Sequence, residues 1–373
     1  MNVLPTIKQE WSLFVSGGTS VAFLVFGQRW LGDLSHQAWF ALMFAWLFTV
    51  ILLSAFAVVR HAESLATKLG EPGGTLILTL AVTGIEVTMI SAVMLTGKGN
   101  PSLARDAMFA VVMIALNGMI GFSLLLGGLR YHEQTYNLQG ANAFLAVIIP
   151  LAVLGLVLPN FTVSSPGPTL SPRQSVFLII MSIGLYAVFL AMQIFRHRNY
   201  FMAPASLEPT EAPYWKCSSD DQDRSALHLM LLLVVHLLPV VILSGQIAVP
   251  ITHAIHELHA PPALAGVLVS VLVLSPESMS AVRAAMGNQL QRSVNLLLGS
   301  VLATISLTIP AVLTIGFVMD QTIILGLDAV GMTLLLLTLG LSLLTFASAR
   351  TNILLGAVHL LLFLAYVMLI FER

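Results

Sequence analysis

Two glutamates in apolar segments carry the side chains best suited to chemistry. Glu86 lies in residues 75–95 and Glu277 in residues 263–282, and each is the sole charged residue of its segment. A carboxylate near the middle of a membrane helix costs roughly 2.5–3.5 kcal/mol on insertion scales, so such a residue indicates a functional site. We therefore predict that Glu86 and Glu277 bind a metal cation or protons within the membrane.

A pair of buried carboxylates suits exchange of a cation for protons. Burial and the neighbouring negative charge both disfavour ionisation, so at least one carboxylate holds a proton when the site is empty. A divalent cation such as Ca²⁺, which accepts about 6–8 oxygen ligands, reverses this preference. Cation and protons then compete for the same oxygens, which is the requirement for antiport.

Hydroxyl and amide side chains near the glutamates could complete the site. Thr79 and Ser270 each lie seven positions before a glutamate, two helical turns away on the same face. Pro276 removes a backbone donor and frees a carbonyl, which predicts a broken helix next to Glu277. The residues that we predict to supply oxygens or to shape the site are Thr79, Thr83, Asn117, Ser270, Ser275, Ser300 and Thr304.

The composition indicates a multi-pass membrane protein. Hydrophobic residues make up 57% of the 373 residues and charged residues 9%, and the mean hydropathy is +0.93, whereas soluble domains carry about 25% charged residues. The net charge of −1 argues against nucleic-acid binding. The single cysteine, Cys217, excludes an intrachain disulfide and a cysteine-based metal site. We expect no cofactor, no cleavable signal peptide and no enzymatic nucleophile–base pair.

Apolar segments of about 20 residues, the length that spans a bilayer as a helix, recur along the chain. They predict an all-α protein with about eleven transmembrane helices, at residues 11–28, 37–59, 74–97, 106–129, 141–160, 174–195, 226–248, 262–282, 293–317, 322–344 and 349–371. With the N-terminus in the cytoplasm, eleven of the 16 Lys and Arg residues fall on the cytoplasmic side. We therefore predict an N-terminus inside and a C-terminus outside.

Similar landmarks occur in both halves of the chain. Arg105 precedes Asn117 by twelve positions, and Arg292 precedes Thr304 by the same interval. Five helices per unit is an odd number, so two such units would have opposite orientations, as in many transporters. We predict four parts: an N-terminal helix (1–36), a first five-helix repeat (37–196), an acidic cytoplasmic loop (197–225) and a second repeat (226–373). The loop is either a solvated linker or a weak cation-collecting or regulatory segment.

Histidines offer a weaker signal. His253, His256 and His259 are spaced three apart near a span end, a pattern open to zinc binding or pH sensing. A solvated interfacial turn is the interpretation that we favour for them. His61 would be the counterpart of His253 and could respond to gating, whereas we expect His236 and His359 to pack within the bundle.

Several motifs resemble the calcium/proton exchanger branch of the cation/Ca²⁺ exchanger superfamily. They are Arg60-His61-Ala62, Leu69-Gly70-Glu71-Pro72, Leu274-Ser275-Pro276-Glu277, Gly287-Asn288-Gln289 and the run from Gly299 to Thr308. The resemblance covers nearly the whole chain. It implies an extra first helix plus two inverted five-helix repeats, paired cation ligands at Glu86 and Glu277, and a place in the bacterial cytoplasmic membrane.

The sequence departs from the usual pattern of that family. The motif Gly-Asn-Ala-x-Glu is replaced by Val-Thr-Gly-Ile-Glu at Glu86 and by Val-Leu-Ser-Pro-Glu at Glu277, so both asparagines are absent. A glutamine of the second repeat is also missing near Thr304. This loss suits a site that takes Na⁺ or K⁺ as well as Ca²⁺. We therefore predict export of Ca²⁺, and of Na⁺ or K⁺, in exchange for H⁺; a cation channel and a non-transporting membrane scaffold are the alternatives.

Overall fold

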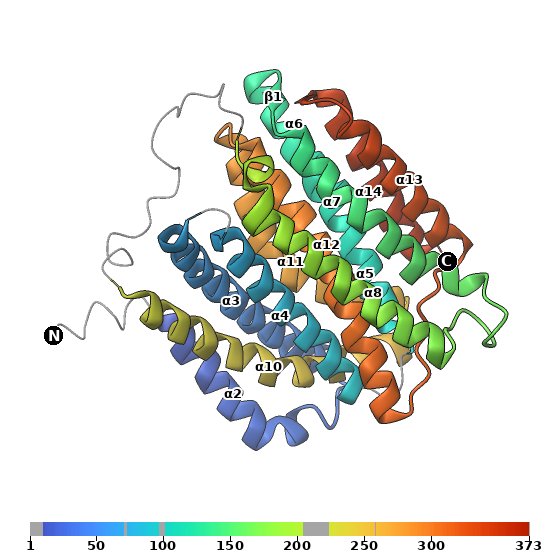
Figure 1. The fold of residues 1–373 in the computed structure, drawn as a ribbon. Coiled ribbons are helices and arrows are strands. Elements are labelled where there is room, and N and C mark those ends of the chain that lie inside the picture. Colours follow the sequence, from blue (N-terminus) through green and yellow to red (C-terminus); the bar gives the residue numbers. More distant parts are fainter. Residues whose placement is uncertain (1–9, 71–72, 97–100, 204–223, 258, 373) are drawn as a thin grey trace.

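Helices make up nearly all the regular structure (Figure 1). The computed structural model describes residues 10–70, 73–96, 101–203, 224–257 and 259–372. Its elements are α2 (Trp11–Trp30), α3 (Gln37–Leu69), α4 (Gly73–Thr96), α5 (Leu103–Val112), η1 (Met113–Met119), α6 (Ile120–Tyr131), β1 (Gln134–Thr135), α7 (Leu138–Ala152), η2 (Val153–Val157), η3 (Leu158–Asn160), α8 (Pro172–Ala191), η4 (Met192–Arg196), η5 (Arg198–Phe201), α10 (Ala226–His256), α11 (Ala263–Met286), α12 (Leu290–Met319), α13 (Ala329–Thr345), β2 (Arg350–Thr351) and α14 (Ile353–Phe371).

These elements form eleven successive helical segments, which confirms the predicted all-α membrane fold. The π-helix η1 joins α5 and α6 into one segment, while short π or 3₁₀ turns extend α7 and α8. Nine segments of the described chain are long and apolar enough to cross a membrane, and the shorter apolar stretches Thr79–Ala92 and Ala329–Thr345 lie in the other two. The surface suits lipid, because large apolar side chains such as Val188, Phe177 and Leu361 are more than 60% exposed.

Helix α12 lies at the centre of the bundle. Most of its residues are buried, and it contacts α4, α7, α8 and α11. Helix α4 packs against α12, and α11 packs against both the α5–η1–α6 segment and α12. Helices α3 and α10, which the predicted repeat would make counterparts, pack together.

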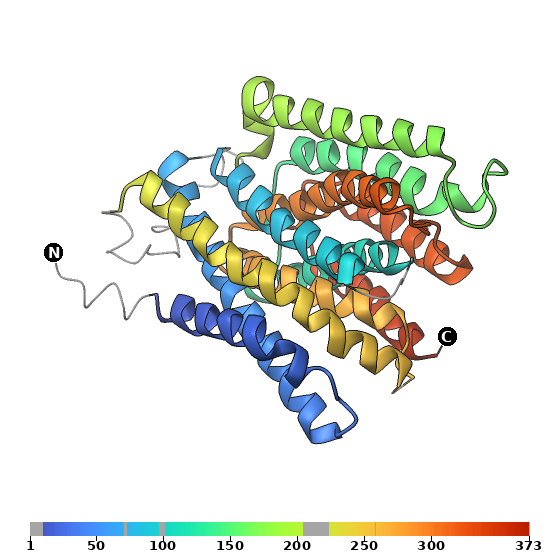
Figure 2. The ribbon, with the colours of Figure 1, turned by 90° about the horizontal axis from the view of Figure 1, so that it is seen from below.

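The first described helix, α2, begins on one side of the bundle, and the last, α14, ends on the other side. Figures 1 and 2 show α2 beginning at the left and α14 ending at the right in both views. This arrangement agrees with an odd number of spans. Glu71 and Pro72, and residues 204–223 with most of the predicted acidic loop, lie outside the described residues.

Three predicted span ends are wrong. Helix α3 continues ten residues past 59, from Arg60 to Leu69, and ends where Gly70 adopts a φ of 71°. Helix α10 likewise continues to His256. Helix α13 begins at Ala329 rather than at 322, because Asp328 caps it by accepting from the Gly331 amide at 2.9 Å.

Candidate functional site

Glu86 lies deep inside the bundle, near the middle of α4. Its side chain is 1% exposed, since α3, α10 and α12 pack around α4. The hydroxyl of Thr304, on α12, donates a hydrogen bond to Glu86 Oε2. Glu86 Oε1 is buried and has no hydrogen-bond partner among the described residues. One oxygen of the carboxyl group is thus held in place, and the other is available to a ligand.

Glu277, on α11, is buried completely. Neither Oε1 nor Oε2 has a partner within the part of the chain that the structure describes. Glu86 is near enough to Glu277 for their two negative charges to repel each other. The Ser300 hydroxyl on α12 lies close enough to Glu277 to stabilise its ionised carboxylate. Within the described part of the chain no cationic side chain pairs with either carboxylate, and two such buried groups require protons or a bound cation.

The predicted break in α11 is absent. Residues Ala263–Met286 form one helix with Pro276 inside it. Proline lacks an N–H, so the carbonyl four residues earlier, that of Leu272, loses its usual helical donor even though the helix continues. Pro276 therefore weakens α11 beside Glu277 without unwinding it.

Both of the hydroxyl residues predicted on α4, Thr79 and Thr83, face the core. The Thr83 hydroxyl donates to the Thr79 carbonyl at 2.8 Å, and both side chains are buried. Thr79 lies against Gly299 of α12 and lines a cavity of about 10 Å³, room for about one water molecule. Gln193 and Asn295 line the same cavity and were missed from the sequence. Thr304 donates to Glu86, whereas Thr79 lines the small cavity next to the two glutamates.

The other predicted residues lie at more varied positions. Ser270 donates to the carbonyls of Gly266 and Ala107, which fixes α11 against α5. Ser275 donates to the Val271 carbonyl of its own helix and is partly exposed. These two hydroxyls hold helices rather than reach either carboxyl group in this arrangement.

Asn117, the counterpart of Thr304, lies in the π-helix η1 and is bound elsewhere. Its Nδ2 donates to Thr338 Oγ1 at 2.7 Å, and its Oδ1 lies 3.1 Å from His359 Nδ1. His359 Nε2 in turn lies 2.8 Å from Thr345 Oγ1. Both Thr338 and His359 are fully buried, as expected for His359. No sequence pattern indicates that they bind Asn117.

A larger cavity of about 320 Å³ lies on the side of the bundle where α2 begins. We call it the vestibule; it is lined by Trp11, Ser12, Leu53, Phe56, Ala57, Val59, Arg60, Glu63, Pro276, Met279, Ser280 and Arg283. Glu63 accepts a hydrogen bond from the Ser280 hydroxyl at 2.7 Å. The carboxylate of Glu63 is also close enough to Glu277 for their negative charges to repel each other. Pro276 adjoins Glu277 in the chain, so the vestibule reaches the immediate neighbourhood of the site.

The hydrogen bond from Thr304 allows a direct test of the site. We expect Thr304→Val, which keeps the shape and removes the donor, to weaken cation binding roughly tenfold, because a hydrogen bond to a charged group contributes about 1.5–3 kcal/mol. The apparent cation affinity for proton release in membrane vesicles measures the effect. Thr314→Val is the matched control, since Thr314 donates to the Pro310 carbonyl of the same helix. An unchanged affinity in Thr304→Val would place Thr304 outside the site.

Comparisons with known proteins agree with this architecture. The sodium/potassium–proton antiporter ChaA of Escherichia coli (strain K12) is 40% identical over 329 residues, which cover 86% of this chain and 86% of that protein. Among solved structures, native YfkE aligns with a TM-score of 0.69 at 18% identity, over 97% of this chain and all of that chain. The H⁺/Ca²⁺ exchanger CAX aligns with a TM-score of 0.67 at 15% identity, over 97% of this chain and 88% of that chain. At these identities the solved structures show the fold alone.

A family profile matches most of the chain. It covers residues 39–195 and 228–372, which together contain α3 to α8 and α10 to α14, and it omits α2 and the segment between the halves. Both site glutamates fall inside the matched regions, one in each. The chain therefore belongs to the sodium/calcium exchanger protein family.

Proposed function

We propose that the protein is a secondary antiporter that exports Ca²⁺, and also Na⁺ or K⁺, from the cytoplasm in exchange for H⁺. The observation that carries this proposal is the pair of buried, uncompensated carboxyl groups of Glu86 and Glu277. The name of the Escherichia coli relative, a sodium-potassium/proton antiporter, supports the choice of ions, and more distant relatives named Ca²⁺/H⁺ antiporters support Ca²⁺.

Exchange follows from competition for the carboxyl oxygens. When Ca²⁺ binds, both carboxyl groups are ionised and compensate its two charges; when Na⁺ or K⁺ binds, one is ionised and the other keeps its proton. When the cation leaves, protons take its place. Thr304 orients Glu86, and Ser300 lies beside Glu277. The two states are both electrically tolerable, whereas a site without either ligand leaves two buried negative charges unpaired. That unfavourable empty state couples cation movement in one direction to proton movement in the other.

The two halves of the chain supply the alternating access that antiport requires. Glu86 and Glu277 come from counterpart helices, α4 and α11, and we propose that the halves are inverted repeats with the site at their interface. The vestibule supplies the route from the side on which α2 begins. By the Lys and Arg distribution this side is cytoplasmic, in a bacterial inner membrane.

The ligand set suits a cation site with mixed selectivity. Near the two carboxyl groups the structure offers hydroxyl oxygens from Thr304 and Ser300 in place of amide oxygens. Ca²⁺ accepts about 6–8 oxygens, so backbone carbonyls and water must complete its shell. A monovalent ion makes smaller demands on such a site, which is why Na⁺ or K⁺ is included in the proposal.

Everted membrane vesicles test the proposed function. In them the cytoplasmic face is outside, and respiration acidifies the interior. Ca²⁺, Na⁺ and K⁺ are added separately while a pH dye reports the interior. We expect each transported ion to release protons from vesicles that contain the protein and not from matched vesicles that lack it. If no ion releases protons although folded protein is present, the antiport hypothesis is wrong, and a cation channel or a membrane scaffold becomes the better hypothesis.

A further inference from the structure

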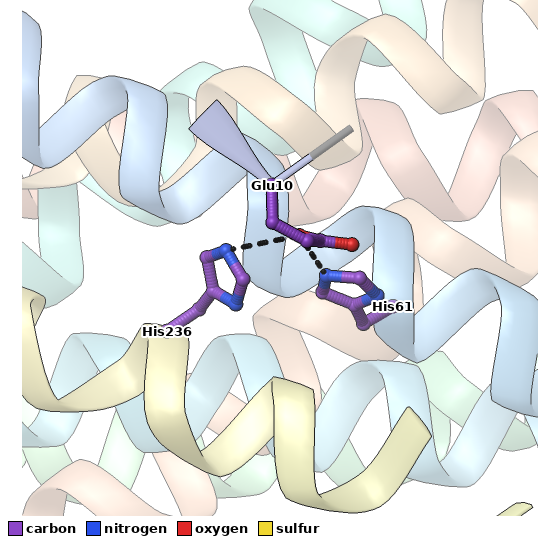
Figure 3. Close-up of side chains that lie close together, drawn as sticks. All are labelled: Glu10, His61 and His236. Atoms are coloured by element: carbon purple, nitrogen blue, oxygen red, sulfur yellow. Dashed lines mark hydrogen bonds and ion pairs between the residues drawn. The ribbon is translucent and has the colours of Figure 1, made fainter. Parts of the chain in front are cut away.

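Three buried titratable side chains meet on the side of the bundle where α2 begins (Figure 3). Glu10 directly precedes α2, His61 belongs to α3, and His236 belongs to α10. The ligand atoms of these residues all lie within 4.8 Å of one another, and all three side chains are buried. None of them belongs to the Glu86–Glu277 site. We call this group the Glu10 cluster.

Glu10 is a fixed negative charge that ties α2 to α3 and α10. Its Oε2 accepts from the Arg60 guanidinium at 3.0 Å and lies 3.2 Å from His61 Nε2, while its Oε1 accepts from Arg224 at 2.9 Å. Burial raises the pKa of Glu10, but the hydrogen bonds from His61 and Arg224 and the charge of Arg60 outweigh burial and lower the pKa to about 2. Glu10 is therefore ionised throughout the range in which histidines titrate.

His236 is placed to bind a proton that Glu10 would stabilise. Its Nδ1 lies 2.8 Å from the Leu232 carbonyl, which can only accept, so Nδ1 carries a hydrogen and a neutral ring has a lone pair on Nε2. Nε2 lies 3.5 Å from Glu10 Oε2 and has no hydrogen-bond partner among the described residues. In the neutral ring this lone pair faces a carboxylate oxygen. A proton on Nε2 would replace that repulsion by a charge-assisted hydrogen bond.

The charged surroundings favour a proton over a metal ion. The spacing of one carboxylate and two imidazoles would also suit a divalent metal. However, the Glu10 carboxylate oxygens already accept hydrogen bonds from Arg60 and Arg224, so a metal ion would have to displace an arginine. Among the described residues, His61, whose ring centre lies 4.9 Å away, also faces His236. A proton on His236 Nε2 displaces none of these partners.

The Glu10 cluster borders the vestibule. Trp11 and Ser12, which follow Glu10 in the chain, line this cavity, and so does Arg60, which binds Glu10. Glu63 lies one helical turn after Arg60 and lines the same cavity. A change in how firmly Glu10 is held would therefore move the start of α2 relative to the opening of the vestibule.

We propose that the Glu10 cluster is a second proton-binding site, separate from the transport site, in which protonation of His236 draws the start of α2 tighter against α3 and α10. Low cytoplasmic pH then narrows the vestibule and slows cation access, and high pH relaxes it. The direction of the effect on transport rests on the proposed function; the proton site and its effect on the vestibule do not.

The accessibility of Ser12 tests this proposal without any transport measurement. Ser12→Cys is made in a Cys217→Ser background, and its labelling by a membrane-impermeant maleimide is followed between about pH 5 and 8, the range in which histidines titrate in proteins. The labelling rate is divided at each pH by the rate in the same protein with His236→Gln, which cancels the pH dependence of the thiol itself. Glutamine cannot take up a proton at this position.

We expect the ratio to fall at least roughly fivefold from the high to the low pH, the effect of one charge-assisted hydrogen bond. His253→Gln is the matched control, because His253 is on the same helix but lies against Phe40, with the ring centres 5.3 Å apart. With this change the ratio should still fall at low pH. A ratio that does not change with pH overturns the proposal.

A second measurement covers the case in which His236→Gln fails to fold. The histidine ring resonances of labelled protein are titrated by NMR in the wild type and in Glu10→Gln. We expect the titration of His236 to move to lower pH in Glu10→Gln, because the carboxylate that stabilises the protonated ring is gone, while that of His253 stays. An unmoved His236 titration, or Zn²⁺ binding to the wild type that Glu10→Gln abolishes, contradicts a proton site.

Discussion

Glu86→Gln is expected to lower cation-driven proton release by at least about 100-fold while the protein still folds. Glutamine keeps the shape and can still accept from Thr304, but it can neither compensate a cation nor carry a proton. Removing one partner of a buried charge pair costs about 3–5 kcal/mol, which corresponds to a loss of binding of at least 100-fold. The rate of proton release per folded transporter in everted vesicles measures the loss.

Glu133→Gln is the matched control for this substitution. Glu133 is also paired, with Arg350 at 3.3 Å, but the pair is exposed at the surface. Exposed ion pairs contribute about 0–1 kcal/mol, so we expect the control to transport at close to the wild-type rate. Wild-type exchange in Glu86→Gln would show that the charge on α4 is not used in transport.

Glu277→Gln is expected to abolish exchange and also the stabilisation of the protein by Ca²⁺. A ligand present at about 100 times its dissociation constant stabilises the folded state by about 2.7 kcal/mol, and this gain requires the binding site. The Ser300 hydroxyl lies beside Glu277, and the amide oxygen of glutamine can accept a hydrogen bond in the same place, so we expect Glu277→Gln to fold. The melting temperature in detergent should therefore rise with Ca²⁺ in the wild type and stay constant in Glu277→Gln.

Ser275→Ala provides the comparison on the same helix. Ser275 lies two residues from Glu277 but donates to the carbonyl of Val271, and its side chain is partly exposed. We expect this variant to keep both exchange and the rise of the melting temperature with Ca²⁺. A Ca²⁺-dependent rise that survives in Glu277→Gln would place the cation elsewhere in the protein.

Much of the architecture could be predicted from the sequence because a bilayer imposes simple rules. Each spanning helix needs an apolar stretch of about 20 residues, and eleven such stretches were found at the positions of the eleven helical segments. The glutamates were conspicuous for the same reason, since a charge inside an apolar stretch has a large energetic cost. Their burial follows from that position alone.

The rest depends on contacts between residues far apart in the chain. The polar run after residue 59 suggested the end of a helix, yet α3 continues because Glu10 and Ser280 pair with Arg60, His61 and Glu63. Nothing near these residues in the sequence indicates those partners.

Asn117 shows the same limit. Its position matched that of Thr304, which contacts Glu86, but the π-helix η1 turns Asn117 toward Thr338 and His359. A shift of hydrogen bonding in one turn thus separates two positions that the sequence pattern treats as equivalent.

The most direct test of the account uses purified protein in liposomes, with a Ca²⁺ indicator outside and a pH dye inside the same vesicles. With an acidic interior, we expect Ca²⁺ uptake and proton release to begin together, to keep a constant ratio as the gradient is varied, and to disappear together in Glu86→Gln and in Glu277→Gln. Ca²⁺ uptake that proceeds without proton release, or that survives in either variant, would contradict exchange at the paired glutamates.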